Sequence, residues 1–167
     1  MELAWGLVSS GRGTWLKGNH EKDLVERIRG DGRHPDSVRT PCQTLQQLGE
    51  GGCRRWLERL DNLPLLHAGE GWTATHAGFD PLTWEPDLSI RGRFWAAYDG
   101  RFGDVVVGHT PGPIVRRLGQ IVLVDTGACY GGRLSAYCPE TGEVISVRGD
   151  RRPAITLRKM EALPSPC

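Results

Sequence analysis

The sequence is organised around Trp72-Thr73-Ala74-Thr75-His76-Ala77-Gly78, in which a short β-strand pattern ends at a histidine followed by two small residues. The apolar run Asp104–Val107 repeats this arrangement, because it leads directly into Gly108-His109-Thr110. A third block, Gly18-Asn19-His20-Glu21, follows Thr14-Trp15-Leu16, which reads as a short buried strand. An imidazole at a strand end is held rigidly, and small residues beside it leave room for a ligand. A hydrolytic metal site needs this combination.

Length and composition favour one ordinary globular domain. The 167 residues are enough for a single core. With 25% charged residues and a formal net charge of +1, the chain gives no electrostatic reason to expect nucleic-acid or anionic-membrane binding. It contains no run of 18 apolar residues, so no membrane-spanning segment is expected. The five cysteines form no Cys-x-x-Cys pair, which is typical of a reduced, cytoplasmic protein.

Helical spacing and turn residues predict the local elements. Apolar spacing predicts helices over residues 1–10 and 21–29, the second of which ends at Gly30. Thr40-Pro41 is a suitable start for a further helix, which is interrupted around Gly49–Gly52. A short amphipathic helix is expected at residues 91–98.

Strand patterns fill most of the second half of the chain. Residues 63–67 and 72–76, separated by Gly69-Glu70-Gly71, predict a β-hairpin. Residues 80–87 are expected to form a loop. Further strands are expected at residues 105–107, 114–117, 121–124, 134–138 and 144–147. Residues 1–149 are therefore expected to form one domain, and residues 150–167 a disordered tail.

The three histidine-containing blocks are candidates for metal chemistry. The Asn19 amide oxygen is a suitable ligand for Mn or Mg, and the adjacent imidazole of His20 can act as a general acid near neutral pH. His76 and His109 are each as consistent with a buried core histidine as with a ligand. Their joint occurrence at strand ends, together with Gly-Asn-His, favours a shared site. His34 and His67 lack such a setting and are interpreted as structural or surface residues.

These blocks, in this order, resemble those of the calcineurin-like metallophosphoesterases. The likeness is greatest to bacterial PPP-type serine/threonine protein phosphatases and their diadenosine tetraphosphatase relatives. Leu88–Phe94 and Val124–Leu134 extend the resemblance over nearly the whole chain. The resemblance implies an α+β fold, namely an αββα layered sandwich of two mixed β-sheets flanked by helices.

The resemblance also implies roles for individual residues. By position, Asn19, His76 and His109 would ligate the second of two divalent metal ions. Manganese is the expected ion, with iron, zinc, nickel or magnesium as alternatives. His20 would protonate the leaving alkoxide, and Arg91 would hold the phosphate oxygens through its planar guanidinium.

Two further residues are candidates for substrate binding. Arg93 is a rival of Arg91 because only one residue separates them, and a solvated helix face is the alternative interpretation of both arginines. Tyr130 either lines the cleft or supplies bulk in a glycine-rich turn.

Two blocks of the family are missing from this sequence. Family members carry Asp-x-His and Gly-Asp-x-x-Asp-Arg-Gly before Gly-Asn-His, and these blocks supply the side-chain ligands of the first metal. Asp23, Asp31 and Asp36 come after Asn19 and are not expected to replace them. We therefore expect a fold that lacks the first β-α units and a site with weak hydrolytic activity. A misplaced start, a fragment and a genuine short paralogue remain alternatives.

The resemblance predicts a metal-dependent phosphoester hydrolase. Phosphoserine or phosphothreonine in a protein is the first expected substrate. A dinucleoside polyphosphatase and an RNA-end-repair phosphatase are the enzymatic alternatives, so the partner is a phosphorylated protein or a small phosphoester. A catalytically inactive phosphoesterase-like domain that binds phosphorylated partners is the non-enzymatic alternative.

Overall fold

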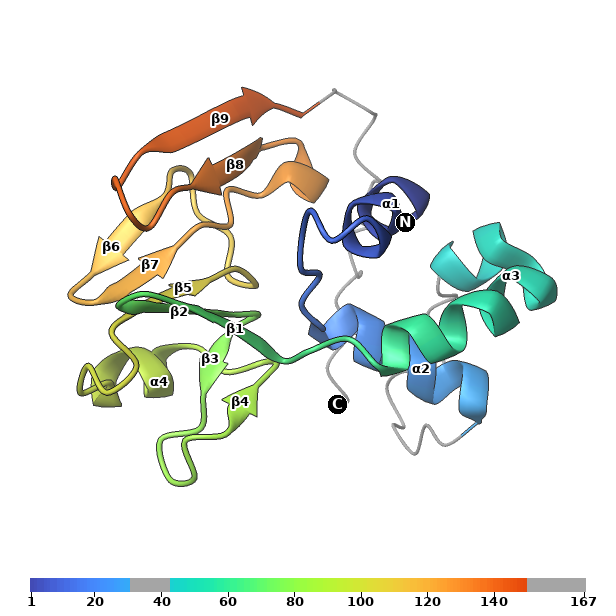
Figure 1. The fold of residues 1–167 in the computed structure, drawn as a ribbon, viewed down its shortest axis with the longest axis horizontal. Coiled ribbons are helices and arrows are strands. Elements are labelled where there is room, and N and C mark those ends of the chain that lie inside the picture. The colour runs from blue at the N-terminus through green and yellow to red at the C-terminus, as the bar shows by residue number, and fades with distance from the viewer. Residues whose placement is uncertain (31–42, 150–167) are drawn as a thin grey trace, which may run out of the picture.

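The computed structural model describes residues 1–30 and 43–149. Figure 1 shows three helices grouped on one side of the molecule and the strands on the other. The three helices are α1 (Glu2–Ser9), α2 (Asn19–Arg29) and α3 (Gln43–Asp61). The predicted helix start at Thr40-Pro41, His34 and the predicted tail at residues 150–167 lie outside the described residues.

A mixed five-stranded sheet forms the centre of the strand side. Its strands lie in the order β1 (Leu66–Gly69), β2 (Trp72–Thr75), β5 (Asp104–Val107), β7 (Ile121–Leu123) and β6 (Arg116–Leu118). The middle strands β2, β5 and β7 are parallel, and the edge strands β1 and β6 are antiparallel to their neighbours. The predicted β-hairpin is confirmed as β1–β2, but its first strand spans Leu66–Gly69 rather than residues 63–67. Gly69 pairs with Trp72, so the turn is Glu70-Gly71.

The sheet buries one core. Val105 and Val107 of β5 are almost fully buried, as the two-residue repeat of a strand requires. They pack in one cluster with Phe79 and with Phe94 of α4 (Gly92–Ala97). Phe79 and Phe94 meet edge to face at 5.8 Å between ring centroids.

Two small antiparallel ribbons accompany the central sheet. β3 (Gly78–Phe79) pairs with β4 (Pro86–Asp87), and β8 (Arg133–Tyr137) pairs with β9 (Val144–Arg148). In the view of Figure 1 the β8–β9 ribbon lies above the central sheet and α4 lies below it. The predicted α+β class is confirmed. Among the described strands, however, only the central sheet is mixed, because both ribbons are purely antiparallel.

The three helices on the other side enclose a second core. It contains Leu24 and Val25 of α2 together with Trp56 and Leu60 of α3. The predicted interruption of the third helix is confirmed at Gly49, whose φ of 64° is not helical. No helix within residues 1–30 and 43–149 combines the length and apolar character needed to cross a membrane.

Three further sequence-based boundaries are corrected by the structure. Thr14-Trp15-Leu16 is irregular rather than a strand. Trp15 instead packs against Trp56 of α3, at 6.2 Å between ring centroids, so helix side chains cover it in part without a sheet partner. α2 begins at Asn19 rather than Glu21, since Glu21 Oε2 accepts the Gly18 N–H at 2.9 Å and caps the helix two residues earlier. The loop predicted at residues 80–87 ends in the short strand β4.

Candidate metal centre

The candidate site lies at the carboxyl ends of the three parallel strands. His76 follows β2, His109 follows β5, and Asp125 follows β7. Backbone hydrogen bonds hold these ends together: the Gly108 N–H donates to the His76 carbonyl at 2.9 Å, and the Val124 N–H donates to the Val107 carbonyl at 2.8 Å. This edge of an open parallel sheet is where ligands bind in α/β folds.

Asn19 reaches the same place from the start of α2. The preceding Gly18 is buried, and a Cβ atom there would lie 2.8 Å from both Nδ1 and Cε1 of His76. The Gly18 φ of −106° is open to any residue. Space beside the imidazole, rather than backbone conformation, therefore requires glycine at this position.

Three polar side chains converge at this edge. His76 Nε2 lies 2.8 Å from Asn19 Oδ1 and 3.2 Å from His109 Nδ1. Ligands held about 2.1 Å from one metal ion stand roughly 3.0–3.4 Å apart in octahedral or tetrahedral geometry. The observed spacings are close to this range, so the three predicted ligands meet at distances that suit a common ion.

The backbone at His109 is unusual. Its φ of 63° is uncommon for a residue other than glycine. The Thr110 N–H donates to the Gly108 carbonyl at 2.6 Å, which closes a three-residue turn around the histidine. The turn brings the imidazole of His109 beside that of His76, at 5.1 Å between ring centroids. Backbone strain of this kind, typically about 1–3 kcal/mol, concentrates at functional sites.

The environment of His76 keeps its imidazole neutral. Burial lowers the pKa of His76 from 6.5 to about 4, and the positive charges of His109 and His20 act in the same direction. The Asp125 carboxylate opposes them. A neutral imidazole offers a nitrogen lone pair, which a metal ligand needs.

The environment of His109 acts in the same direction. Burial is the main cause of its lowered pKa, followed by the positive charge of Arg91. The Ser89 backbone and the Asp125 carboxylate oppose this lowering. Its Nε2 atom is buried without a hydrogen-bond partner in the described part of the chain. An imidazole with one nitrogen at the meeting point and the other enclosed is suited to ligation.

The donor set fits a divalent ion of the later transition-metal type. It consists of one amide oxygen and two imidazole nitrogens, and imidazole suits zinc, copper, iron and nickel. It contains no carboxylate, so hard cations are expected to bind weakly. No group of three His, Cys, Asp or Glu side chains that could hold a metal occurs among the residues that the structure describes. The trio therefore depends on the Asn19 amide as its third donor.

The other predicted site residues lie at exposed positions. His20 is exposed beside Asn19, and its charge helps to lower the pKa values of His76 and His109. Arg91 precedes α4, and its charge acts on His109.

Arg93 and Tyr130 are not linked to the two histidines in the way that His20 and Arg91 are. Arg93 is exposed on α4 and is not among the charges that act on His109. Tyr130 belongs to the short 3₁₀ helix η1 (Ala128–Tyr130), and 77% of its surface is exposed.

Asp125 is the site residue to which the sequence assigned no role. Its Oδ1 accepts the Gly127 N–H at 2.8 Å, and its charge acts on both His76 and His109. Asp125 follows β7, which runs parallel to the strand that precedes His109. The parallel pairing itself is not visible in the sequence.

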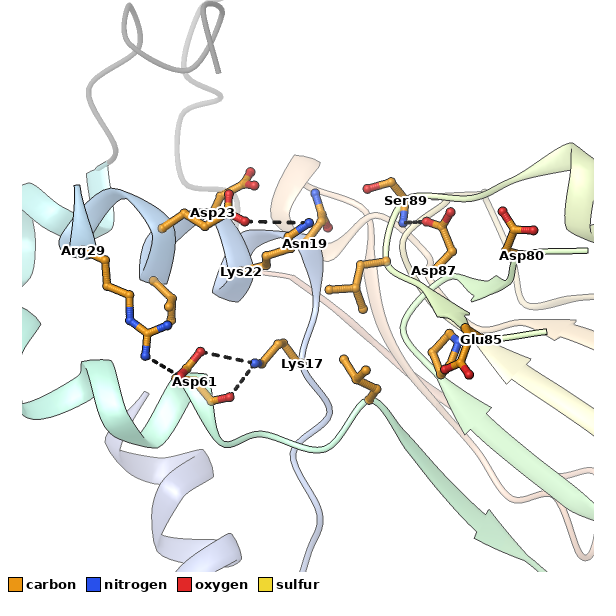
Figure 2. Close-up of a pocket in the computed structure, with 15 residues that line it drawn as sticks. Lys17, Asn19, Lys22, Asp23, Arg29, Asp61, Asp80, Glu85, Asp87 and Ser89 are labelled. Atoms are coloured by element: carbon orange, nitrogen blue, oxygen red, sulfur yellow. Dashed lines mark hydrogen bonds and ion pairs between the residues drawn. The ribbon is translucent and has the colours of Figure 1, made fainter. Parts of the chain in front are cut away.

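A cavity of about 810 Å³ opens beside Asn19. Figure 2 shows Lys17 and Arg29 pointing toward Asp61 on the helix side, and Asp80, Glu85 and Asp87 on the opposite side. Arg29 Nη2 and Asp61 Oδ2 form an ion pair at 2.6 Å, and Lys17 Nζ lies 3.7 Å from Asp61 Oδ1. Asn19 lines this cavity, whereas His76 and His109 are not among its lining residues.

Comparison with known proteins gives distant likenesses. No protein-family model matches the chain. The asymmetrical bis(5'-nucleosyl)-tetraphosphatase PrpE of Bacillus subtilis is 26% identical over 171 residues, which cover 85% of this chain and 69% of that protein. The crystal structure of a "putative diadenosine tetraphosphatase" aligns with a TM-score of 0.62 at 20% identity, covering 87% of this chain and 72% of that chain.

A second solved structure shares the fold. A hypothetical protein from Pyrococcus horikoshii OT3 aligns with a TM-score of 0.57 at 15% identity, covering 89% of this chain and 67% of that chain. These likenesses confirm that the chain shares its α+β fold with both solved structures. At 26% identity, the chain thus resembles a protein that is named as a hydrolase of nucleoside tetraphosphates.

Proposed function

We propose that this protein is a metal-dependent hydrolase that cleaves a phosphoanhydride bond of dinucleoside polyphosphates. The convergence of Asn19, His76 and His109 at one strand edge carries the proposal. The relative from Bacillus subtilis is named for cleavage of a dinucleoside tetraphosphate, which favours this substrate over the phosphoprotein expected first from the sequence. The substrate is therefore a small phosphoester with several linked phosphates.

The converging side chains hold the ion in this proposal. Asn19 Oδ1, His76 Nε2 and His109 Nδ1 would ligate a divalent cation. The ions to test are manganese, which the resemblance implies, and zinc, which the two imidazoles favour. When bound, the ion supplies Lewis-acid polarisation of a phosphoryl oxygen and lowers the pKa of bound water. The low pKa of His76 keeps this ligand unprotonated at neutral pH.

The exposed residues around the trio would handle the substrate. Arg91 lies close enough for its charge to act on His109, and its guanidinium is suited to bidentate contact with phosphate oxygens. Arg93 is the alternative for that contact. His20 lies beside a ligand yet is exposed, which suits a general acid that protonates the leaving oxygen.

The donor set predicts slow turnover. The three donors include no carboxylate. The described residues also contain no group of three His, Cys, Asp or Glu side chains that could hold a second ion. The site therefore does not offer the two adjacent ions that stabilise the attacking and leaving oxygens in a two-metal centre. The same observation favours a second candidate function, in which the domain binds phosphoesters without cleaving them.

Product analysis with matched substrates tests the proposal. The protein loaded with manganese or with zinc is incubated with diadenosine tetraphosphate or with a phosphoserine peptide, and released nucleotides and phosphate are measured. We expect nucleotide release above the metal-free background, and its loss in His109→Ala. His67→Ala is the matched control, because His67 is exposed on β1 and lies outside the site. Faster cleavage of the peptide would contradict the proposed substrate, and binding without cleavage would support the non-catalytic domain.

A second variant tests the general acid. His20→Ala is expected to lower kcat by roughly 10²- to 10⁴-fold, the usual contribution of one positioned acid. Metal affinity measured by calorimetry should stay within a few-fold, because His20 is not one of the three donors. An unchanged kcat would remove His20 from the mechanism.

A further inference from the structure

A second hollow, of about 450 Å³, lies next to the candidate metal centre. Its lining residues include Pro111, Pro113 and Tyr130. Pro111 is only two residues beyond His109, and the Gly112 N–H donates to the carbonyl of Asp125 at 3.0 Å. The hollow is therefore anchored to the same strand ends that carry the metal ligands.

The Tyr130 side chain presents an open aromatic face. Although its ring is apolar, 77% of the residue is exposed. Its backbone is nevertheless fixed in a tight turn between Gly127 (φ 72°) and Gly131 (φ 81°), and its N–H donates to the Gly127 carbonyl at 2.9 Å. An exposed ring on a fixed backbone contributes little to the stability of the fold, but its face is accessible for stacking on a planar ligand.

The charges around the hollow are positive. Arg133 lines it and donates from Nη2 to the Ser146 carbonyl at 2.9 Å. Arg116 lies directly behind Gly112, where a Cβ atom would come within 2.9 Å of its Nε. That Nε is buried without a hydrogen-bond partner in the part of the chain that the structure covers. The residues that line the hollow include no Asp or Glu. The hollow thus combines an aromatic platform with the guanidinium group of Arg133 at its wall, and Arg116 lies behind the wall at Gly112.

We propose that this hollow binds one nucleobase of the substrate, stacked on Tyr130 and flanked by Pro111 and Pro113. The attached phosphates then run past the guanidinium group of Arg133 toward His109. This inference rests on the proposed function and deepens it by assigning a base-binding subsite. Because every base has a π-face, stacking tolerates different bases. The site is therefore expected to accept nucleotides with little preference among bases.

Nucleotide binding to the metal-free protein tests this subsite separately from catalysis. Calorimetry compares adenosine 5'-monophosphate with ribose 5-phosphate, which carries the same phosphate without the base. We expect the nucleotide to bind the wild-type protein at least several-fold more tightly. Tyr130→Ala should weaken nucleotide binding by about 5- to 150-fold, the loss of one aromatic stacking contact. Tyr130→Phe should retain the binding, because the ring rather than the hydroxyl makes the contact.

The controls separate the subsite from folding and from the proposed function. Cys129→Ser changes an exposed neighbour in the same turn and should bind the nucleotide like the wild type. Equal affinity for the two probes, or unchanged nucleotide affinity in Tyr130→Ala, would overturn the subsite. Nucleotide binding through Tyr130 without hydrolysis of diadenosine tetraphosphate would sustain the subsite and reject the hydrolytic function. Hydrolysis of diadenosine tetraphosphate with an unchanged KM in Tyr130→Ala would sustain the hydrolytic function and reject the subsite.

Discussion

At the scale of single residues, the contact between Gly18 and the His76 ring decides whether the metal site can assemble. Gly18→Ala would place a methyl group 2.8 Å from two ring atoms of His76. We expect the ring to shift away from Asn19, with metal affinity at least tenfold lower and a loss of about 1–3 kcal/mol in stability from overpacking. Calorimetric metal titration and urea unfolding measure the two effects.

Gly13→Ala is the matched control for this substitution. A Cβ atom at Gly13 would meet only Leu7 Cβ, at an ordinary 3.7 Å. This variant should therefore bind metal like the wild type. Wild-type metal affinity in Gly18→Ala as well would show that the space beside His76 is not required.

The depressed pKa of His76 predicts how stability depends on pH. Its pKa is about 4 in the folded protein against an ordinary value of 6.5. Between pH 4 and 6.5, His76 is therefore mostly protonated in the unfolded chain and mostly neutral in the folded chain. The free energy of unfolding of the metal-free protein should therefore be highest above pH 6.5 and fall as the pH drops toward 4. His109 contributes in the same direction because its pKa is also lowered.

Urea midpoints measured at several pH values between 7 and 4 check this prediction. His76→Gln should reduce the pH dependence and leave the part that His109 supplies. A midpoint that rises on acidification in this window, or an identical profile in His76→Gln, would contradict the assignment of a buried neutral imidazole.

At the scale of elements, local signals explain both the successes and the failures of the sequence-based prediction. The β1–β2 hairpin and the strand before His109 were predictable because alternation and turn glycines lie within a few residues. β3 and β4 were missed because two-residue strands, one of them containing Pro86, carry no periodic pattern. The strand predicted at Thr14-Trp15-Leu16 was wrong because apolar residues predict contact with a core, but not whether a sheet or a helix makes that contact. Trp15 is half-buried against α3.

The packing of Trp15 against α3 leads to a prediction for that helix. Trp56 is 1% exposed and packs between Trp5 and Trp15, with ring centroids 6.0 and 6.2 Å away. Trp56→Ala should lower the free energy of unfolding by about 3–5 kcal/mol, the typical effect of removing a fully buried aromatic side chain. Leu57→Ala, at a half-buried neighbouring position, should have a clearly smaller effect.

Hydrogen exchange identifies where the Trp56→Ala variant loosens. Faster exchange is expected in α2 and α3, whose side chains share the cluster around Trp56. The amides of β5 and β7 belong to the other cluster and should change less. Uniform acceleration over both regions would show that the two clusters behave as one cooperative unit.

At the scale of the whole molecule, the candidate metal centre joins two separately packed parts. Asn19 belongs to the helices around Trp56, whereas His76 and His109 belong to the central sheet. The convergence of these three residues was predictable from their motifs. The role of Asp125 was not, because it depends on the strand order β2-β5-β7, in which the last two strands are separated in sequence by β6. A metal ion at this position would tie the helices to the sheet.

Metal addition should therefore stabilise the protein as a whole. At a free metal concentration 100 times the dissociation constant, binding to the folded state contributes about 2.7 kcal/mol. For a chain of this length that corresponds to a rise in Tm of roughly 5–10 °C. The rise should be lost in Asn19→Ala and kept in Asn62→Ala, where the altered amide is exposed and donates to the Glu58 carbonyl one helical turn away. An equal rise in Asn19→Ala would mean that the ion binds without the helices, and the bridge between the two parts would be rejected.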